Sequence, residues 1–160
     1  GHGATVMSTT RRTSTAASDL LKQHGVDQVV VDTGDIAGDV LKIGPEGADE
    51  VLELVGTKTL DDSLACAKIG GTVCMSGIVG NEWTLNNWNP MESIPLGVCL
   101  TSYSGGLTEF LETPLNDLAQ QIKGGKLKLP ISKTFDLDNI GKAHKFMEDN
   151  EALGKIVVLV

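Results

Sequence analysis

The sequence is short of cysteine, histidine and aromatic residues, and it has no long apolar run. Its cysteines are odd in number, lack Cys-x-x-Cys spacing, and are Cys66, Cys74 and Cys99. This pattern argues against a disulfide framework and predicts three reduced, mostly buried thiols in a cytoplasmic protein. The three histidines are too far apart in the sequence to suggest a metal site, and we expect none. No stretch approaches the ~18 apolar residues of a membrane span, and no signal-peptide pattern opens the chain.

Positive charge is also scarce. The 160 residues include 13 basic and 21 acidic side chains, which gives a net charge of -8. This balance disfavours broad binding to nucleic acid or to an anionic membrane. A pair of arginines in such a chain is therefore a local feature rather than part of a basic surface. With 41% hydrophobic and 21% charged residues, the composition is that of an ordinary globular domain.

Apolar runs of strand length alternate with helix-like runs along the first half of the chain. Strands are predicted at 4–9, 27–32, 48–56 and 72–80, helices at about 14–24 and 59–71, and an irregular segment around 37–43. This alternation predicts an α/β fold with one doubly wound parallel sheet and helices on both of its faces. Downstream we expect a loop at 81–97, strands at 98–104, 131–137 and 155–160, and helices at about 114–123 and 138–149.

The first strand ends in a polar run, Thr9, Thr10, Arg11 and Arg12. Ligands of doubly wound sheets lie beyond the carboxyl ends of the strands, and the end of the second strand faces the adenosine ribose. An acid there suits the ribose hydroxyls of NAD. Arginine with small hydroxyls suits a 2′-phosphate, because the guanidinium fork pairs with phosphate oxygens. The run therefore predicts a 2′-phosphate clamp, and a solvated turn with two surface arginines is the alternative.

Two further strand ends contain glycine. Val55 and Gly56 lie at the carboxyl end of the third predicted strand, and Ser76, Gly77, Ile78 and Gly80 lie at the carboxyl end of the fourth. Glycine lets a ligand approach the backbone, although tight turns also use it without any ligand. Three such ends on one edge of a sheet favour a shared ligand site.

Several blocks of the sequence resemble the cofactor-binding half of the medium-chain dehydrogenase/reductase superfamily. They are TVMSTTRR, ADEVLELVG, GGTVCMSG and the closing AHKFMEDNEALGKIVVLV, and together they span nearly the whole chain. Within the superfamily, the sequence is most similar to quinone oxidoreductase-like and zinc-type alcohol dehydrogenase-like members. The resemblance implies a Rossmann-type doubly wound parallel sheet in an NADP-dependent oxidoreductase. Such an enzyme transfers a hydride from NADPH to a quinone, enone or carbonyl substrate.

The resemblance also implies which residues contact NADPH, and it assigns no catalytic acid or base to this chain. Residues 9–12 would hold the 2′-phosphate. Residues 55–56 would lie on the nicotinamide-ribose side, and 76–78 would meet the carboxamide. The strand Val98–Ser104 would be the sheet edge across which two copies form a homodimer, which explains an apolar edge that would otherwise favour aggregation.

The implied fold is truncated, because the chain would begin at the family's second strand. Residues 1–130 would be a nucleotide-binding domain without the first strand and its Gly-rich turn, and 131–160 would return to a catalytic domain. The missing strand would leave its neighbours with unpaired backbone groups, at a cost of about 1–3 kcal/mol for each buried group. We expect the apolar segment 155–160, or its copy from a second chain, to fill the gap. We expect the chain alone to be inactive.

Two other functions remain open at this point. A methyltransferase also uses a doubly wound sheet, but it needs an acid after the second strand, where this chain has Arg11 and Arg12. A non-catalytic dimerisation or regulatory module fits a chain without its first strand. Other polar and aromatic residues are interpreted as structural, with helix capping expected for Asp61 and Asp62 and packing of the long loop for Trp83 and Trp88.

Overall fold

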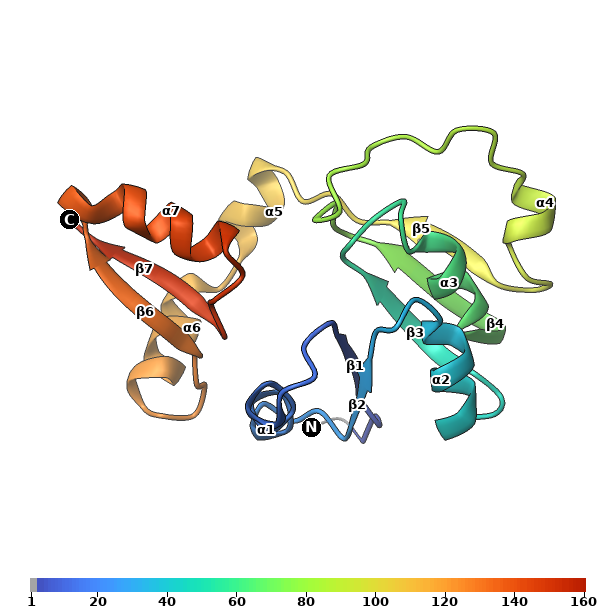
Figure 1. Ribbon diagram of the computed structural model, residues 1–160, viewed down its shortest axis with the longest axis horizontal. Helices are drawn as coiled ribbons and strands as arrows, with labels where there is room; N and C mark the ends of the chain where they lie inside the picture. The colour runs from blue at the N-terminus through green and yellow to red at the C-terminus, as the bar shows by residue number, and fades with distance from the viewer. Residues whose placement is uncertain (1–2) are drawn as a thin grey trace.

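The computed structural model describes residues 3–160, and its strands form three small sheets (Figure 1). The first sheet contains β1 (Met7–Thr10) and β2 (Gln28–Val31). The second contains, in spatial order, β3 (Ala48–Glu53), β4 (Ala67–Met75) and β5 (Cys99–Ser102). The third contains β6 (Ile131–Asp136) and β7 (Lys155–Leu159). Every pair is parallel, which confirms the predicted α/β class.

Helices connect most of the strands, as parallel pairing requires. Their bounds are α1 Thr15–Gln23, α2 Ile36–Ile43, α3 Leu60–Ala65, α4 Pro90–Ser93, α5 Leu107–Glu112, α6 Leu115–Lys123 and α7 Ile140–Glu148, with a 3-10 turn at Leu137–Asn139. Four of them, α1, α3, α6 and α7, fall within the ranges that the sequence predicts for helices. The other three are not predicted: α2 forms where an irregular segment is expected, α4 forms in the expected loop, and the apolar pattern does not indicate α5.

β4 starts earlier than the sequence predicts and contains Gly70 and Gly71. The pattern predicts a helix over 59–71, but α3 ends well before the glycine pair. The register between β3 and β4 shifts between Ala48 and Glu50, so the additional residues of β4 bulge out of the ladder. Gly70 has a φ of 81°, which a residue with a side chain rarely adopts. The glycine pair thus permits a bulge within a strand and does not end a helix.

The first two sheets are parts of the predicted doubly wound sheet, and they are separate ladders. Within residues 3–160, β1 pairs with β2 alone and β3 pairs with β4 alone. β1 and β3 therefore each have one open edge, and they are the two strands that the resemblance places on either side of the family's first strand. Side chains join the parts, because Val30, Val40 and Cys66 form a buried cluster against which Met7 of β1 and Val51 of β3 pack.

Asp62 of α3 strengthens this junction. Its carboxylate oxygens accept hydrogen bonds from the backbone nitrogens of Ile36 at 2.8 Å and Ala37 at 3.0 Å. These donors belong to the first turn of α2, whose amide groups have no partner within their own helix. Both acids, Asp61 and Asp62, lie in the first turn of α3, as predicted, but neither caps that helix: Asp62 caps the neighbouring helix α2, and Asp61 accepts a hydrogen bond from Trp88.

The two tryptophans of the long loop differ in their packing. Trp88 packs against the buried cluster of Leu60, Leu64, Val73 and Val98. Its Nε1 donates a hydrogen bond of 2.7 Å to a carboxylate oxygen of Asp61. Trp83 is 72% exposed. The packing role predicted for the pair is therefore confirmed for Trp88 and wrong for Trp83.

The position of the last strand contradicts one expectation. β7 pairs in parallel with β6, from Ile131 opposite Lys155 to Asp136 opposite Leu159, and not with β1 or β3. β6, α7 and β7 form a compact β-α-β unit in which the Phe135 and Phe146 rings lie 6.0 Å apart. Pairing with a strand that is reached through one short crossover costs less chain entropy than pairing in a gap far along the chain. The prediction that 155–160 fills the gap within its own chain is wrong, and filling by a second chain stays a prediction.

Candidate cofactor-binding site

The polar end of β1 forms one wall of an open hollow of about 470 Å³. Thr10, Arg11 and Arg12 line it together with Asn150, which belongs to the loop between α7 and β7. Thr10 is in register with Val31 of β2, and its hydroxyl accepts a hydrogen bond of 3.1 Å from the backbone nitrogen of Arg12. The turn is thus ordered by its own threonine, as threonine side chains commonly do at strand ends.

The two arginines have different surroundings. Arg11 is exposed, whereas Arg12 is half-buried. The Nη2 atom of Arg12 donates to the backbone oxygen of Asn150 and, at 2.9 Å, to that of Ala152. Sequence reasoning treated the arginines as equivalent, because a local pattern cannot show a partner about 140 residues away.

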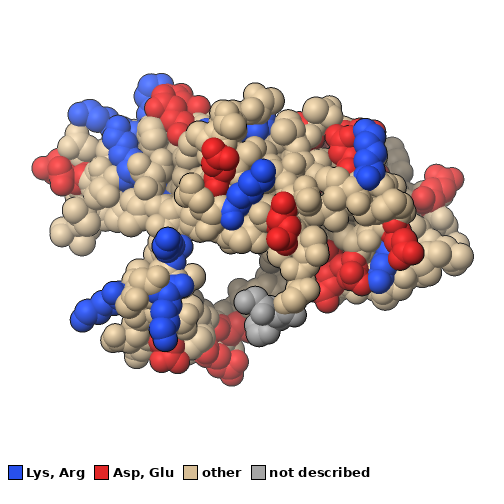
Figure 2. Space-filling model, turned by 90° about the horizontal axis from the view of Figure 1, so that it is seen from below, with Lys and Arg blue, Asp and Glu red and all other residues tan. Residues whose placement is uncertain are grey.

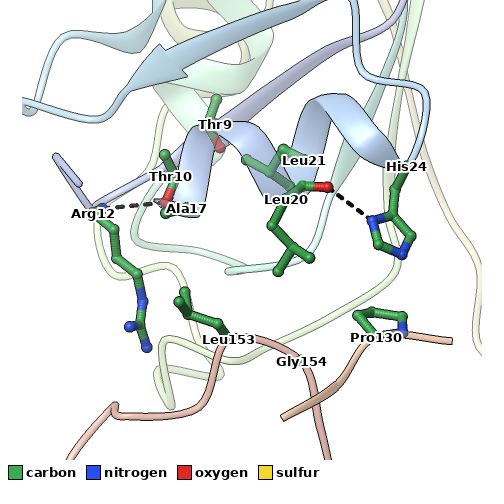
Figure 3. Close-up of a pocket in the computed structure, with 10 residues that line it drawn as sticks. All are labelled: Thr9, Thr10, Arg12, Ala17, Leu20, Leu21, His24, Pro130, Leu153 and Gly154. Atoms are coloured by element: carbon green, nitrogen blue, oxygen red, sulfur yellow. Dashed lines mark hydrogen bonds between the residues drawn. The ribbon is translucent and has the colours of Figure 1, made fainter. Parts of the chain in front are cut away.

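A second cavity of about 420 Å³ adjoins this hollow (Figure 3). Leu20 and Leu21 of α1, with His24 directly after that helix, face Pro130 and the two residues that precede β7 across it, and the end of β1 lies at one side. Thr9 lines this cavity rather than the first one. The structure therefore divides the predicted clamp, with Thr10 and Arg12 at the border of both spaces.

The charge around the end of β1 is local, as the sequence predicts. On the face shown in Figure 2, basic and acidic side chains are interspersed, and neither sign forms a continuous field. The ion pairs found among residues 3–160 are Lys42 with Asp39, Lys68 with Asp49 and Lys145 with Asp149. Neither arginine belongs to these pairs, so no carboxylate of the described chain neutralises them.

The other predicted residues meet at the carboxyl ends of β3 and β4, where the two strand arrows end side by side (Figure 1). The backbone nitrogen of Ser76 donates to the backbone oxygen of Glu53 at 2.8 Å, and that of Gly80 donates to the backbone oxygen of Val55 at 2.8 Å. The ladder thus continues into the turn that holds Gly77 and Ile78. The structure brings residues 55–56 and 76–78 together, as predicted.

The glycines of these turns are required by the packing of backbone on backbone. A Cβ on Gly77 would overlap the carbonyl oxygen of Leu54 and lie 3.0 Å from its carbonyl carbon. A Cβ on Gly56, which has a φ of 102°, would come within 3.1 Å of the Gly77 oxygen. The glycines therefore have a structural reason that does not depend on a ligand, and they also leave the strand ends without side chains.

Glu53 is the site residue that sequence reasoning missed. Its side chain is 4% exposed and lies beneath the turn after β3. One carboxylate oxygen accepts from the backbone nitrogens of Val55 at 2.6 Å and Gly56 at 2.8 Å. The other accepts from the hydroxyls of Thr59, at 3.0 Å, and Ser63. A buried carboxylate with four donors fixes the shape of the predicted nicotinamide-side turn.

The three cysteines differ in their exposure. Cys66 is buried, Cys74 is half-buried and Cys99 is exposed on β5, so the prediction of mostly buried thiols is wrong for Cys99. Burial, together with the nearby carboxylates of Asp62 and Glu53, raises the pKa of Cys66 to about 11. Cys66 therefore stays a neutral thiol near pH 7, and a neutral thiol is a poor nucleophile.

The two parts of the candidate site remain separate in the described chain. Residues 9–12 are at the end of a strand of the first sheet, and residues 55–56 and 76–78 are at the ends of strands of the second. Among the described residues, 3–160, no hydrogen bond joins the two groups. The described residues also contain no group of three or more His, Cys, Asp or Glu side chains arranged to hold a metal ion. Over the same residues, no helix is long and apolar enough to cross a bilayer.

Parallel β-α-β units with polar and glycine-rich strand ends define a nucleotide-binding fold of the α/β class. Comparison with known proteins is specific: the zinc-binding dehydrogenase family matches residues 24–158, and the chain belongs to this family. The resemblance to medium-chain dehydrogenases/reductases is thereby confirmed, and the part matched is the cofactor-binding one.

Two of the relatives that match nearly the whole chain are named as reductases. The chain is 28% identical over 158 residues to acryloyl-coenzyme A reductase of Sulfurisphaera tokodaii, covering 98% of this chain and 43% of that protein. It is 26% identical over 164 residues to 2-haloacrylate reductase of a Burkholderia species, covering 98% and 48%. The structure of mycobacterial Rv1454c complexed with NADPH aligns with a TM-score of 0.77 and 25% identity, covering 99% of this chain and 49% of that one. The chain thus spans about half the length of these relatives.

Proposed function

We propose that this chain is the NADPH-binding part of an oxidoreductase that reduces a quinone, an enone or a carbonyl compound. The observation that carries the proposal is the hollow at the end of β1, where Arg11 lies beside Thr10, is exposed and has no ion-pair partner among residues 3–160. An exposed guanidinium at this strand end suits a 2′-phosphate, which NADP has and NAD lacks. The complex of a similar fold with NADPH supports the same cofactor.

The bound cofactor would supply the hydride, and the protein would bind and orient it. Residues 9–12 would hold the 2′-phosphate, while the turns at 55–56 and 76–78 would border the nicotinamide side. Glu53 holds the first of these turns in place. The names acryloyl-coenzyme A reductase and 2-haloacrylate reductase, both describing double bonds conjugated to a carbonyl, favour the enone class among the proposed substrates.

The chain would contribute cofactor binding, and a separate catalytic domain would complete the active site. We propose that 1–130 is the nucleotide-binding domain, that 131–160 returns to a catalytic domain, and that the chain alone does not turn over substrate. The protein would work in the cytoplasm, where its three free cysteines stay reduced. The strands of residues 131–160 pair with each other, which supports treating this segment as a separate unit.

Cofactor choice is tested by calorimetric titration of the protein with NADP, NAD and 2′,5′-ADP. We expect Arg11→Ala to weaken 2′,5′-ADP binding by about tenfold to a hundredfold, because a charge-assisted pair with phosphate is lost. NAD binding should change little. Lys22→Ala, which removes an exposed positive charge on α1 outside the hollow, is the matched control. Equal affinities for NAD and NADP, insensitive to Arg11→Ala, would refute the proposed cofactor.

We also propose that two copies pair across β5 to form a homodimer. β5 is the outer strand of its sheet, and its four residues are exposed. The nitrogen of Tyr103 donates to Met75 of β4 at 3.0 Å. Because successive backbone groups of a strand alternate in direction, the N–H of Ser102 points to the open edge.

Ser102→Pro removes that outward donor without removing a hydrogen bond to β4, since proline is tolerated at sheet edges. We expect sedimentation velocity to show a dimer for the unaltered protein and for Ser102→Ala, and a monomer for Ser102→Pro. A dimer that persists in Ser102→Pro, or a monomeric unaltered protein, would contradict pairing through β5.

A further inference from the structure

We propose that Asn150 contacts the 2′-phosphate directly and that Arg12 is a positioning residue that holds Asn150 in the site. The inference rests on the proposed function, and it adds a binding residue from the loop between α7 and β7. It also gives the two arginines different tasks, with Arg11 as the arginine that pairs with phosphate.

The hydrogen bonds of Arg12 carry the first step. Its Nη2 atom, which carries two hydrogens, donates to two backbone oxygens, those of Asn150 and Ala152. A bidentate pair with phosphate, whether from the end or from the side of the guanidinium, needs one of these hydrogens. Arg12 therefore cannot form such a pair while the loop is docked. Arg11 is exposed, and within residues 3–160 no hydrogen bond engages its guanidinium.

The position of Asn150 carries the second step. It lines the same hollow as Arg11, so it lies close to the end of β1 in space although the two are far apart in the sequence. Its backbone is left-handed, with a φ of 55°, a conformation that asparagine tolerates better than most residues. Its side-chain nitrogen is 3.5 Å from the oxygen of Glu148, a weak contact that leaves the amide able to donate elsewhere.

The charges around Asn150 are mixed. Asp149, one of its neighbours in the chain, is paired with Lys145 at 2.8 Å, whereas Glu151, the other neighbour, is exposed and belongs to none of the ion pairs found among residues 3–160. Arg11 and Arg12 lie on the opposite wall of the hollow. A neutral amide donor next to two guanidinium groups complements a phosphate without adding a carboxylate that would repel it.

The same contacts couple ligand binding to docking of the loop. The hollow is complete only while Arg12 holds the loop, so a ligand that touches both walls must stabilise the docked position. By reciprocity, loss of docking must weaken the binding of that ligand. The backbone nitrogen of Leu153, which donates to the Ser132 hydroxyl at 3.1 Å, and that of Glu151, which donates to Phe146 at 3.3 Å, report on the loop through hydrogen exchange.

The test compares 2′,5′-ADP with 5′-AMP, which lacks the 2′-phosphate. We expect Asn150→Asp to weaken 2′,5′-ADP binding by about tenfold, through charge repulsion, and to leave 5′-AMP binding unchanged. Asn150→Gly keeps the left-handed backbone and removes only the amide, so we expect a loss of roughly threefold. Asn139→Asp adds the same charge at the other end of α7, a helix roughly 13 Å long, and should change neither affinity.

Hydrogen exchange supplies the second readout. Arg12→Ala should speed exchange at residues 151–153 in the ligand-free protein and weaken 2′,5′-ADP binding. In the unaltered protein, 2′,5′-ADP should slow exchange at the same residues, whereas 5′-AMP should not. Binding that collapses in Arg11→Ala but is unchanged in Asn150→Asp, with no protection of the loop, would overturn this inference and leave the proposed function intact. No preference for 2′,5′-ADP over 5′-AMP would overturn both.

Discussion

Replacing Glu53 by alanine is expected to lower the free energy of unfolding by roughly 3–5 kcal/mol, as other losses of a buried charged partner do. The carboxylate accepts four hydrogen bonds and is 4% exposed, so its removal leaves four donors facing a cavity. Each unsatisfied buried group costs about 1–3 kcal/mol, although water entering the cavity recovers part of this. Denaturant unfolding followed by circular dichroism measures the change.

Two further variants separate the hydrogen bonds of Glu53 from its volume and from general loss of charge. Glu53→Gln keeps one carbonyl oxygen for Val55 and Gly56, and the hydroxyls of Thr59 and Ser63 can rotate to accept from the new amide. We expect this variant to lose about 1–2 kcal/mol, the difference between charged and neutral hydrogen bonds. Glu50→Ala changes an exposed carboxylate of the same strand and should be close to neutral. A Glu53→Ala protein as stable as Glu50→Ala would show that the carboxylate does not hold the turn.

The polar end of β1 was predictable because all of its signal is local. A strand that ends in two threonines and two arginines is unusual in an acidic chain, and the strand end is where a doubly wound sheet meets its ligand. The different surroundings of Arg11 and Arg12 were not predictable. They depend on a loop about 140 residues away, and a β-α-β pattern does not specify how the C-terminal unit packs against β1.

The errors have a common physical origin, which is that one residue type serves several structures. Glycine after an apolar helix-like run marks a helix end, but the same pair permits the bulge of β4. Glu53 is the last residue of a strand whose acids at 49 and 50 are exposed, so nothing in the pattern indicates that it is buried. One signal was available: an acid two residues before a Val-Gly pair can accept the amide hydrogens of that turn.

The open edges of β1 and β3 follow from the alignment of motifs, whereas the partner of β7 does not. Apolar composition made the segment 155–160 suitable for any parallel edge. The choice between edges is set by chain connectivity, since β6 is one crossover away and the gap beside β1 is far along the chain. Composition therefore predicted the strand, and topology decided its neighbour.

Gly77→Ala is expected to destabilise the protein by about 3 kcal/mol, at the upper end of the cost of overpacking, because the atoms it meets cannot move independently. The new methyl group would overlap the Leu54 carbonyl oxygen and lie 3.0 Å from the Leu54 Cα. Leu54 follows Glu53, which is in register with Met75. The backbone oxygen of Glu53 accepts a hydrogen bond of 2.8 Å from the backbone nitrogen of Ser76. Relief of the clash would have to break this part of the ladder. Gly141→Ala, in α7 with open space around it, should instead stabilise by about 0.5–1 kcal/mol.

The same variant separates the two halves of the proposed cofactor site. If residues 76–78 border the nicotinamide, movement of this turn must weaken the binding of NADP, which has that ring, more than the binding of 2′,5′-ADP, which lacks it. We expect Gly77→Ala to reduce NADP affinity by about tenfold at a temperature where the variant is folded, with 2′,5′-ADP affinity unchanged. Arg11→Ala should weaken both ligands, because both contain the 2′-phosphate. Equal losses of NADP and 2′,5′-ADP in Gly77→Ala would mean that the turn after β4 supports the fold alone and that the nicotinamide lies elsewhere.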